Sequence, residues 1–300
     1  MTFLRGLCAF PITPSDRNGR VDVDDLRTLV AKLCAADVDS IGLLGSTGTY
    51  MYLSREERRR ALAAALEETG GRAPIVVGIG ALRTDESVKL AQDARTLGAA
   101  AGLLAAISYT PLTDDEVFEH FSTVAREGGL PIVIYDNPGA THFRFSSALV
   151  SRLAEVPGIT AIKNPTDKAE DIGGHLAGLR RTLPKGFSIG YSGDWNATEA
   201  MIAGADTWYS VLGGILPAIC LKIVRAAQQR DAAEARRLDA ELAPLWSLFR
   251  RFSSLRTVYA LSELLDICRP EPPRPILGLS AAAKRQIAEV LEQLPAGTAR

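Results

Sequence analysis

The sequence predicts an α/β protein folded as a (β/α)8 TIM barrel with a C-terminal helical extension. Three observations predict it: short apolar segments recur along the chain, each is followed by a segment with helical periodicity, and the alternation runs through eight units. Strands that alternate with helices imply a parallel sheet, and eight such units close most naturally into a barrel. A doubly wound open sheet is the rival architecture, which is disfavoured because no GxGxxG motif follows the first strand.

The predicted strands are continuous apolar runs, as expected for strands buried on both faces. They span residues 6–12, 40–45, 74–80, 101–107, 131–136, 159–164, 187–193 and 207–213.

Helical patterns follow the first three strands. In residues 21–36 the apolar positions are spaced i, i+3, i+4 and i+7. We expect the second helix to begin at Ser54, with Glu57 completing a capping box. The third is expected to begin at Thr84 and to end at Gly98.

The pattern changes beyond about residue 215, where strand-like runs stop and helical ones continue. The segment RPEPPRP, residues 269–275, reads as a rigid connector between two of these helices. We therefore divide the chain into a barrel, residues 1–230, and a helical extension packed on it, residues 231–300.

Composition excludes several classes of function. With 34 basic and 35 acidic residues the formal net charge is −1, so we expect no nucleic-acid partner and no binding to an acidic membrane surface. No apolar run is long enough to cross a membrane, and the first residues do not resemble a signal peptide. The four cysteines lie far apart without CxxC spacing, which is typical of reduced thiols and predicts a cytoplasmic protein. The three histidines form no HxxxH or HxH pair, so we expect no metal site.

Chemistry in such barrels lies at the carboxyl ends of the strands. The segment GSTG follows the second strand and contains Ser46, Thr47 and Gly48. Its backbone N–H groups and hydroxyls could form a nest for a small carboxylate or phosphate, or the segment could be a simple glycine turn. Tyr109 and Tyr135 follow the fourth and fifth strands; phenols can relay protons, although such tyrosines are by default packing residues.

Lys163 stands at the end of the sixth strand, just before Pro165. An ammonium beside an apolar barrel mouth is poorly solvated, which favours the neutral amine. A neutral amine can attack a ketone and form a Schiff base. The alternative is a structural lysine paired with a carboxylate such as Asp194.

These segments resemble one known family. AFPITP, GSTG, SYTP, YDNPG, AIKN and SGDW match, in order and spacing, the dihydrodipicolinate synthase / N-acetylneuraminate lyase family over roughly residues 5 to 280. The resemblance implies a (β/α)8 barrel with a C-terminal helical extension, and usually a homotetramer built as a dimer of dimers. It also implies a lysine imine with pyruvate or a related 2-keto acid as the small-molecule partner, with no other cofactor.

The resemblance also implies roles for individual residues. Lys163 would form the Schiff base, Tyr135 would act as general acid and base, and Ser46 and Thr47 would bind the keto acid's carboxylate and relay protons. Tyr109 would reach into a neighbouring subunit's site. Three further positions complete the implied substrate-binding set: Gly48, Gly193 and Tyr209.

The sequence departs from the family pattern at two positions, and the first of them concerns the second substrate. Dihydrodipicolinate synthases carry an arginine after the tyrosine motif for the second substrate's carboxylate, and that position is Ala140 here. The family usually has an acidic residue after its GTTG-type motif, and the residue at that position here is Thr49. Arg144 or His142 could substitute for the arginine, but each is better read as a loop or helix-entry residue.

The leading interpretation is a metal-independent class I lyase or aldolase that acts on pyruvate or another 2-keto acid. A narrower alternative is 4-hydroxy-tetrahydrodipicolinate synthase itself, which Ala140 disfavours. A third possibility is a barrel that binds a keto acid without turnover. The intact pair of Lys163 and Tyr135 disfavours it, because a mere binder has no need for both groups.

Overall fold

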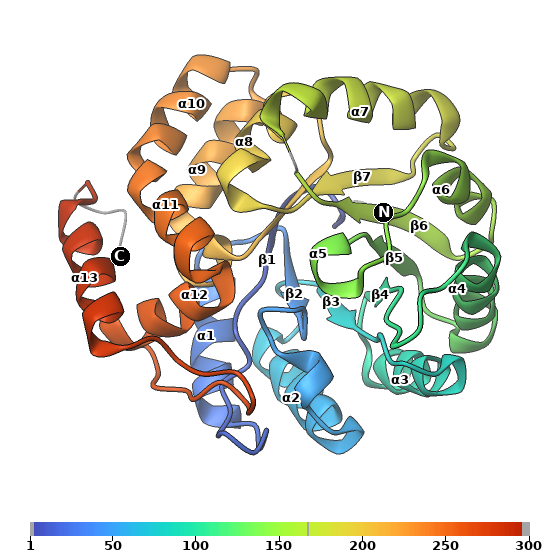
Figure 1. Cartoon of the computed structure of the whole chain (residues 1–300), viewed down its shortest axis with the longest axis horizontal. Helices are drawn as coiled ribbons and strands as arrows, with labels where there is room; N and C mark the ends of the chain where they lie inside the picture. Colours follow the sequence, from blue (N-terminus) through green and yellow to red (C-terminus); the bar gives the residue numbers. More distant parts are fainter. Residues whose placement is uncertain (1–2, 167, 296–300) are drawn as a thin grey trace.

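A computed structural model describes residues 3–166 and 168–295. Its parallel strands close into a barrel in chain order, which confirms the predicted fold class (Figure 1). The strands are β1 (Gly6–Ala9), β2 (Ser40–Leu43), β3 (Ile75–Gly78), β4 (Ala101–Ala105), β5 (Ile132–Tyr135), β6 (Ile159–Asn164), β7 (Ser188–Tyr191) and β8 (Thr207–Ser210). β8 closes the barrel by pairing with β1, from Gly6 opposite Thr207 to Ala9 opposite Ser210.

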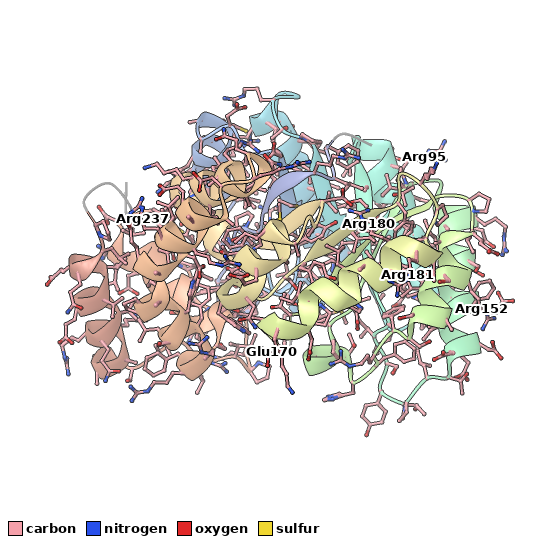
Figure 2. The ribbon with its side chains drawn as sticks, turned by 90° about the horizontal axis from the view of Figure 1, so that it is seen from above. Arg95, Arg152, Glu170, Arg180, Arg181 and Arg237 are labelled. Carbon is pink, nitrogen blue, oxygen red and sulfur yellow. The ribbon has the colours of Figure 1, made fainter. Side chains whose placement is uncertain are left out.

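A helix follows each strand on the outside of the barrel (Figure 1). These helices are α1 (Val23–Ala35), α2 (Arg55–Thr69), α3 (Thr84–Leu97), α4 (Asp114–Gly128), α6 (Ser147–Ala154), α7 (Ala169–Thr182), α8 (Asp194–Ile202) and α9 (Pro217–Gln228). The buried positions of α1 are Leu26, Leu29, Val30 and Leu33, the ones that the periodicity predicts. Arginines such as Arg152 on α6 and Arg181 on α7 lie on this outer layer (Figure 2).

The predicted helix ends are partly correct. Ser54 caps α2 by accepting the N–H of Glu57, and Gly98 ends α3 in the left-handed region with φ of 102°. The capping box is wrong in its second half, because the Glu57 carboxylate accepts the N–H of Val21 instead. The Thr84 cap is also wrong.

Arg83 precedes the first turn of α3, and Thr84 is its first helical residue. The Thr84 hydroxyl lies 2.9 Å from Nδ1 of His120 on α4. The Thr84 hydroxyl, which the sequence predicts as a helix cap, therefore contacts the neighbouring helix α4 instead.

Three short elements lie outside the predicted pattern. They are the 3-10 helices η1 (Tyr50–Tyr52) and η2 (Leu212–Gly214), and the four-residue helix α5 (Pro138–Thr141). All of them follow carboxyl ends of strands, so they belong to the loops that shape the barrel mouth.

The tail contains α10 (Ala232–Glu241), α11 (Ala243–Phe252), α12 (Ser254–Leu264) and α13 (Ala281–Gln293). Figure 1 shows these helices grouped on one side of the molecule, beside α8 and α9. In the described part of the chain no strand follows β8, as predicted.

Side chains fill the barrel interior. A separate buried cluster there includes Cys8, Phe10, Val133, Tyr135 and Tyr209. The Phe10 ring lies against β2 because residue 42 is glycine: a Cβ at Gly42 would lie 2.2 Å from the ring. The four cysteines are free and three are buried, in keeping with the prediction of reduced thiols.

Candidate active site

A cavity of about 310 Å³ opens at the carboxyl ends of the strands. Loops that follow β1, β2, β5, β6, β7 and β8 supply most of its wall, and the C-terminal helices add Phe249 and Ser254. Lys163, Tyr135, Ser46 and Thr47 all line it. The barrel therefore brings together four of the predicted catalytic residues from distant parts of the chain.

Lys163 lies one residue before the end of β6 and is directly opposite Tyr135, the last residue of β5. Neighbours in register on adjacent strands point to the same face, so both side chains enter the barrel mouth. Lys163 is buried, with 3% of its surface exposed. Its Nζ lies 4.1 Å from the ring centroids of both Phe10 and Tyr135, and 5.8 Å from that of Tyr209.

The alternative pairing of Lys163 with Asp194 is not what the structure shows. Asp194 accepts hydrogen bonds from Trp208 Nε1 at 2.9 Å and from the N–H groups of Val211 and Leu212 at 3.3 and 2.7 Å. Burial raises the pKa of the Asp194 carboxyl, while these hydrogen bonds and the Lys163 charge oppose the rise. Asp194 thus fixes the loop after β8, and among the described residues no carboxylate forms an ion pair with Lys163.

A hydroxyl pair lines the same cavity as the amine. The Tyr135 phenol oxygen is 3.1 Å from Ser46 Oγ, and Asn137 Nδ2 donates to the phenol at 3.0 Å and to Ser46 Oγ at 3.3 Å. Sequence reasoning missed Asn137. The only signal was its place two residues after Tyr135, and an asparagine before a proline reads as an ordinary helix or turn start.

The segment after β2 forms a tight turn at the cavity wall. The N–H of Thr49 donates to the Ser46 carbonyl at 3.0 Å, and the Thr47 side chain faces the cavity. Gly48 lies behind the turn, since a Cβ there would be 2.8 Å from Thr13 Oγ1. Thr49 is buried with φ of 52°.

The remaining predicted residues divide into three cases. Gly193 lines the cavity with φ of 91°, and a Cβ there would lie 2.3 Å from Thr166 Oγ1. Tyr209 is fully buried in the barrel, packed edge-on against Phe10 and outside the cavity wall. Tyr109 is 99% exposed and lies outside the cavity of its own chain.

Charge is sparse in the cavity. Among its described lining residues only Lys163 and Asp194 are charged, and Asp194 is already hydrogen-bonded. Ala140, in α5, is exposed and does not line the wall. His142 and Arg144 are exposed and lie outside the wall as well.

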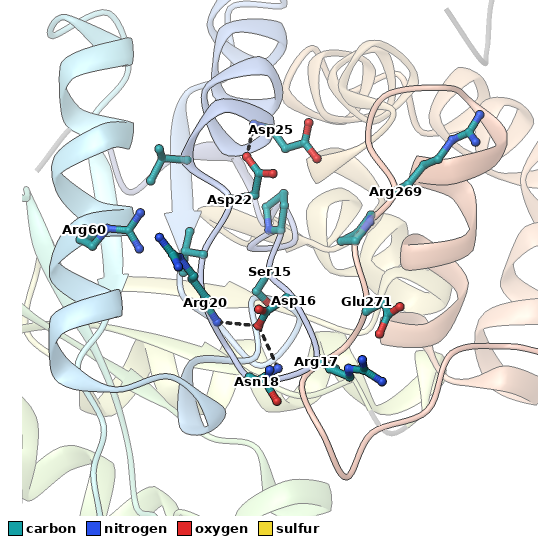
Figure 3. Close-up of a pocket in the computed structure, with 14 residues that line it drawn as sticks. Ser15, Asp16, Arg17, Asn18, Arg20, Asp22, Asp25, Arg60, Arg269 and Glu271 are labelled. Carbon is teal, nitrogen blue, oxygen red and sulfur yellow. Dashed lines mark hydrogen bonds between the residues drawn. The ribbon is translucent and has the colours of Figure 1, made fainter.

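A larger, open groove of about 670 Å³ lies elsewhere, between the loop after β1 and residues 269–271 (Figure 3). Three of its polar side chains serve local structure. Asp16 accepts the N–H groups of Asn18 and Arg20, Asp22 caps α1, and Arg60 pairs with Glu57. We therefore take the cavity at Lys163 as the candidate active site.

The described residues contain no cluster of three or more metal-ligating side chains. They also contain no helix with the length and apolar character needed to span a bilayer.

Known proteins match this chain over almost its whole length. The model of the Dihydrodipicolinate synthetase family matches residues 3–294. A 4-hydroxy-tetrahydrodipicolinate synthase from Methylococcus capsulatus is 32% identical over 283 residues, covering 94% of this chain and 95% of that protein.

Solved structures agree with these matches. The crystal structure of a dihydrodipicolinate synthase from Agrobacterium tumefaciens is 54% identical, with a TM-score of 0.95 and coverage of 98% of this chain and 99% of that one. Another, from Acinetobacter baumannii and complexed with pyruvate, is 26% identical, with a TM-score of 0.90 and coverage of 97% and 99%. The predicted resemblance and enzyme class are confirmed. The chain belongs to the dihydrodipicolinate synthetase family.

Proposed function

We propose that the protein is a Schiff-base-forming lyase or aldolase that acts on pyruvate or a related 2-keto acid, with Lys163 as the nucleophile. The observation that carries this proposal is the position of the amine: it is buried at the cavity, in register with Tyr135 and close to the ring of Tyr135, whose hydroxyl pairs with Ser46. A nucleophile within reach of a proton-transferring group is the arrangement that covalent catalysis requires.

Imine formation uses each of these groups. The neutral Lys163 amine attacks the ketone carbon, and a proton passes from the nitrogen to the carbonyl oxygen to give a carbinolamine. A second proton, delivered through Tyr135, lets that oxygen leave as water and forms the protonated imine. The rings of Phe10, Tyr135 and Tyr209 surround the nitrogen and stabilise its positive charge through their π faces.

The turn after β2 would bind the keto acid's carboxylate. The Thr47 hydroxyl lies on the cavity wall, and the turn over residues 46–49 presents backbone N–H groups from one compact segment. With the carboxylate there, the ketone carbon can meet Lys163. No metal or further cofactor enters this proposal, because the imine itself withdraws electrons from the neighbouring carbon.

Carbon–carbon chemistry follows from the imine. Loss of a proton from the carbon next to it gives an enamine, which attacks the carbonyl carbon of an acceptor aldehyde. The new alkoxide takes a proton from the relay, and water then releases the product from Lys163. Cleavage is the same sequence run backwards.

The cavity favours an acceptor without a second carboxylate. Its described wall offers no cation besides Lys163, and residue 140 is an exposed alanine. The names of the relatives support the alternative, 4-hydroxy-tetrahydrodipicolinate synthase itself. On that alternative the protein would join pyruvate to aspartate semialdehyde. A panel of 2-keto acids and aldehydes, assayed in both directions, distinguishes the two alternatives. Turnover confined to aspartate semialdehyde would contradict the proposal that the acceptor has no carboxylate.

A homotetramer built as a dimer of dimers is the assembly that we propose. Met51, Tyr52, Leu82 and Tyr109 are exposed apolar side chains on the successive loops after β2, β3 and β4. These three strands are neighbours in the barrel, and exposed apolar side chains that gather in one region often mark an interface. Tyr109, fully exposed in a single chain, would then reach a neighbouring site. We place the enzyme in the cytoplasm, in keeping with its free thiols.

Deuterium exchange tests the proposed chemistry without knowledge of the acceptor. In D₂O the protein should replace the C3 hydrogens of pyruvate with deuterium, followed by loss of the methyl signal in proton NMR. Lys163→Met should abolish the exchange, because it removes the amine and keeps the side chain's length. No exchange by the unmodified protein would leave the non-catalytic binding barrel, and exchange by Lys163→Met would contradict the proposed nucleophile.

A further inference from the structure

Asn137 occupies a helix start without capping it. It precedes α5 with φ of −139° and ψ of 67°, and its side chain makes no cap hydrogen bond. Its backbone carbonyl does the local work by accepting the N–H groups of Ala140 and Thr141 at 2.9 and 3.0 Å. An asparagine at this position normally accepts a backbone N–H with its side chain. Here the side chain is directed into the active site instead.

The amide closes a triangle with the two hydroxyls. Nδ2 of Asn137 lies 3.0 Å from the Tyr135 oxygen and 3.3 Å from Ser46 Oγ, which are themselves 3.1 Å apart. Asn137 has no positive charge, yet it is the donor in both contacts. Tyr135 and Ser46 are each left with one proton of their own to place.

This geometry constrains the protons. Only one hydrogen can lie between the two oxygens, and neither hydroxyl can donate to a nitrogen that is itself a donor. The second hydroxyl must therefore direct its proton away from the other two groups of the triangle. The cavity that contains Lys163 borders both groups. When an oxygen gives up its proton, its bond to Asn137 becomes charge-assisted and stronger.

We propose that Asn137 is a positioning residue of the proton relay. Its amide keeps one hydroxyl proton of the Tyr135–Ser46 pair directed at the reacting centre, and it stabilises the oxygen that has lost a proton. This inference rests on the proposed Schiff-base function. Asn137 acts through Tyr135 and needs no contact with the substrate.

Two variants test it. Asn137→Leu removes both donated bonds at little cost to α5, because the side chain caps nothing. For the exchange of the C3 hydrogens of pyruvate we expect kcat to fall about 10- to 100-fold, which is the range for a lost hydrogen bond to a charged group. The KM for pyruvate should change less than about threefold. Ser147→Ala, at the exposed start of α6, is the matched control and should keep full activity.

Asn137→Asp preserves shape and reverses the polarity. An ionised carboxylate only accepts, so it should pull both hydroxyl protons toward itself and slow turnover more than leucine does. Activity should recover partly as the pH falls and the carboxyl gains a proton, a response that a merely structural role would not produce. This variant also provides the answer if Asn137→Leu fails to fold.

A double-mutant cycle tests whether Asn137 acts through Tyr135. In the Tyr135→Phe background, Asn137→Leu should have almost no further effect on kcat. Additive losses, a kcat of Asn137→Leu within twofold of the unmodified enzyme, or a pH-independent loss in Asn137→Asp would each overturn the inference. Failure of the proposed function is separate: the unmodified protein would then show no exchange of pyruvate hydrogens, and the inference would fall with it.

Discussion

At residue scale the active site depends on a buried amine with an unusual environment. Lys163 is nearly inaccessible, yet aromatic rings surround its nitrogen and no described carboxylate forms an ion pair with it. Cation–π contacts of this kind recover only part of the hydration that a buried ammonium loses. The fold therefore maintains at this position a residue that serves reactivity at the cost of stability.

Replacing that amine should stabilise the protein. Lys163→Met keeps the length and removes the group that is poorly solvated, so the free energy of unfolding should rise by about 1–2 kcal/mol. Thermal denaturation followed by circular dichroism measures it, with Lys185→Met on the exposed surface as the control. A lower midpoint for Lys163→Met would show that the amine is structural.

Removal of the phenol hydroxyl should slow chemistry and spare the fold. In Tyr135→Phe the ring still packs under Lys163, but the pair with Ser46 is lost. Turnover should fall by ~10²–10⁴-fold, the usual contribution of a general acid–base group. Tyr259→Phe, on a buried tyrosine of α12 outside the cavity wall, controls for the substitution itself, and unchanged turnover in Tyr135→Phe would remove that residue from the mechanism.

At element scale the barrel could be predicted because its strands are continuous apolar runs, and all eight are found. They end earlier than predicted where apolar residues leave the ladder: β1 stops at Ala9, and Phe10 turns into the mouth. Tertiary partners changed local expectations at Glu57 and Thr84. α5 is too short to show a period.

Part of the active site could also be predicted from the sequence. Lys163, Tyr135, Ser46 and Thr47 stand at strand ends, where the fold itself predicts chemistry. Asn137 was not predictable, because its contact with Ser46 joins positions 91 residues apart and depends on the closed barrel. Tyr209 also lies on a strand, but its side chain is fully buried and does not line the cavity, which a sequence does not reveal.

The contact between α3 and α4 gives a prediction on pH. Burial lowers the pKa of His120 to about 4, from 6.5 in the unfolded chain. Between these two pH values the unfolded state binds more protons than the folded state. The contribution of the neutral, buried His120 to the free energy of unfolding is therefore fully present above pH 6.5 and is lost as the pH falls to about 4. The largest loss of unfolding free energy that His120 can cause is roughly 3 kcal/mol, at 1.36 kcal/mol per pKa unit.

His120→Asn tests this prediction. Its side chain can keep the contact with Thr84 but does not titrate. Urea unfolding at pH 7.5 and 4.5 should show a smaller loss of stability for the variant than for the unmodified protein. Equal losses would assign the acid sensitivity to other groups.

At the scale of the whole molecule the cavity draws on nearly the full chain. Its wall runs from Phe10 to Ser254, so the C-terminal helices complete a site that the barrel begins. The proposed assembly extends this dependence, since Tyr109 lies outside the cavity of its own chain.

Disrupting the exposed apolar loops should separate subunits. Leu82→Glu places a charge on the loop after β3, the strand between those whose loops carry Met51, Tyr52 and Tyr109, whereas Leu277→Glu alters a comparably exposed leucine elsewhere. Sedimentation should show a tetramer for the unmodified protein and Leu277→Glu, and smaller species with reduced turnover for Leu82→Glu. A fully active monomer before any substitution would contradict the proposed assembly.

The central claim is that one amine forms a covalent bond to a keto acid, and borohydride trapping tests it most directly. Protein incubated with pyruvate and sodium borohydride is digested, and the modified peptide is identified by mass spectrometry. The account predicts a reduced adduct on Lys163 and none in Lys163→Met. An adduct on a different lysine, or no adduct at all, would contradict it.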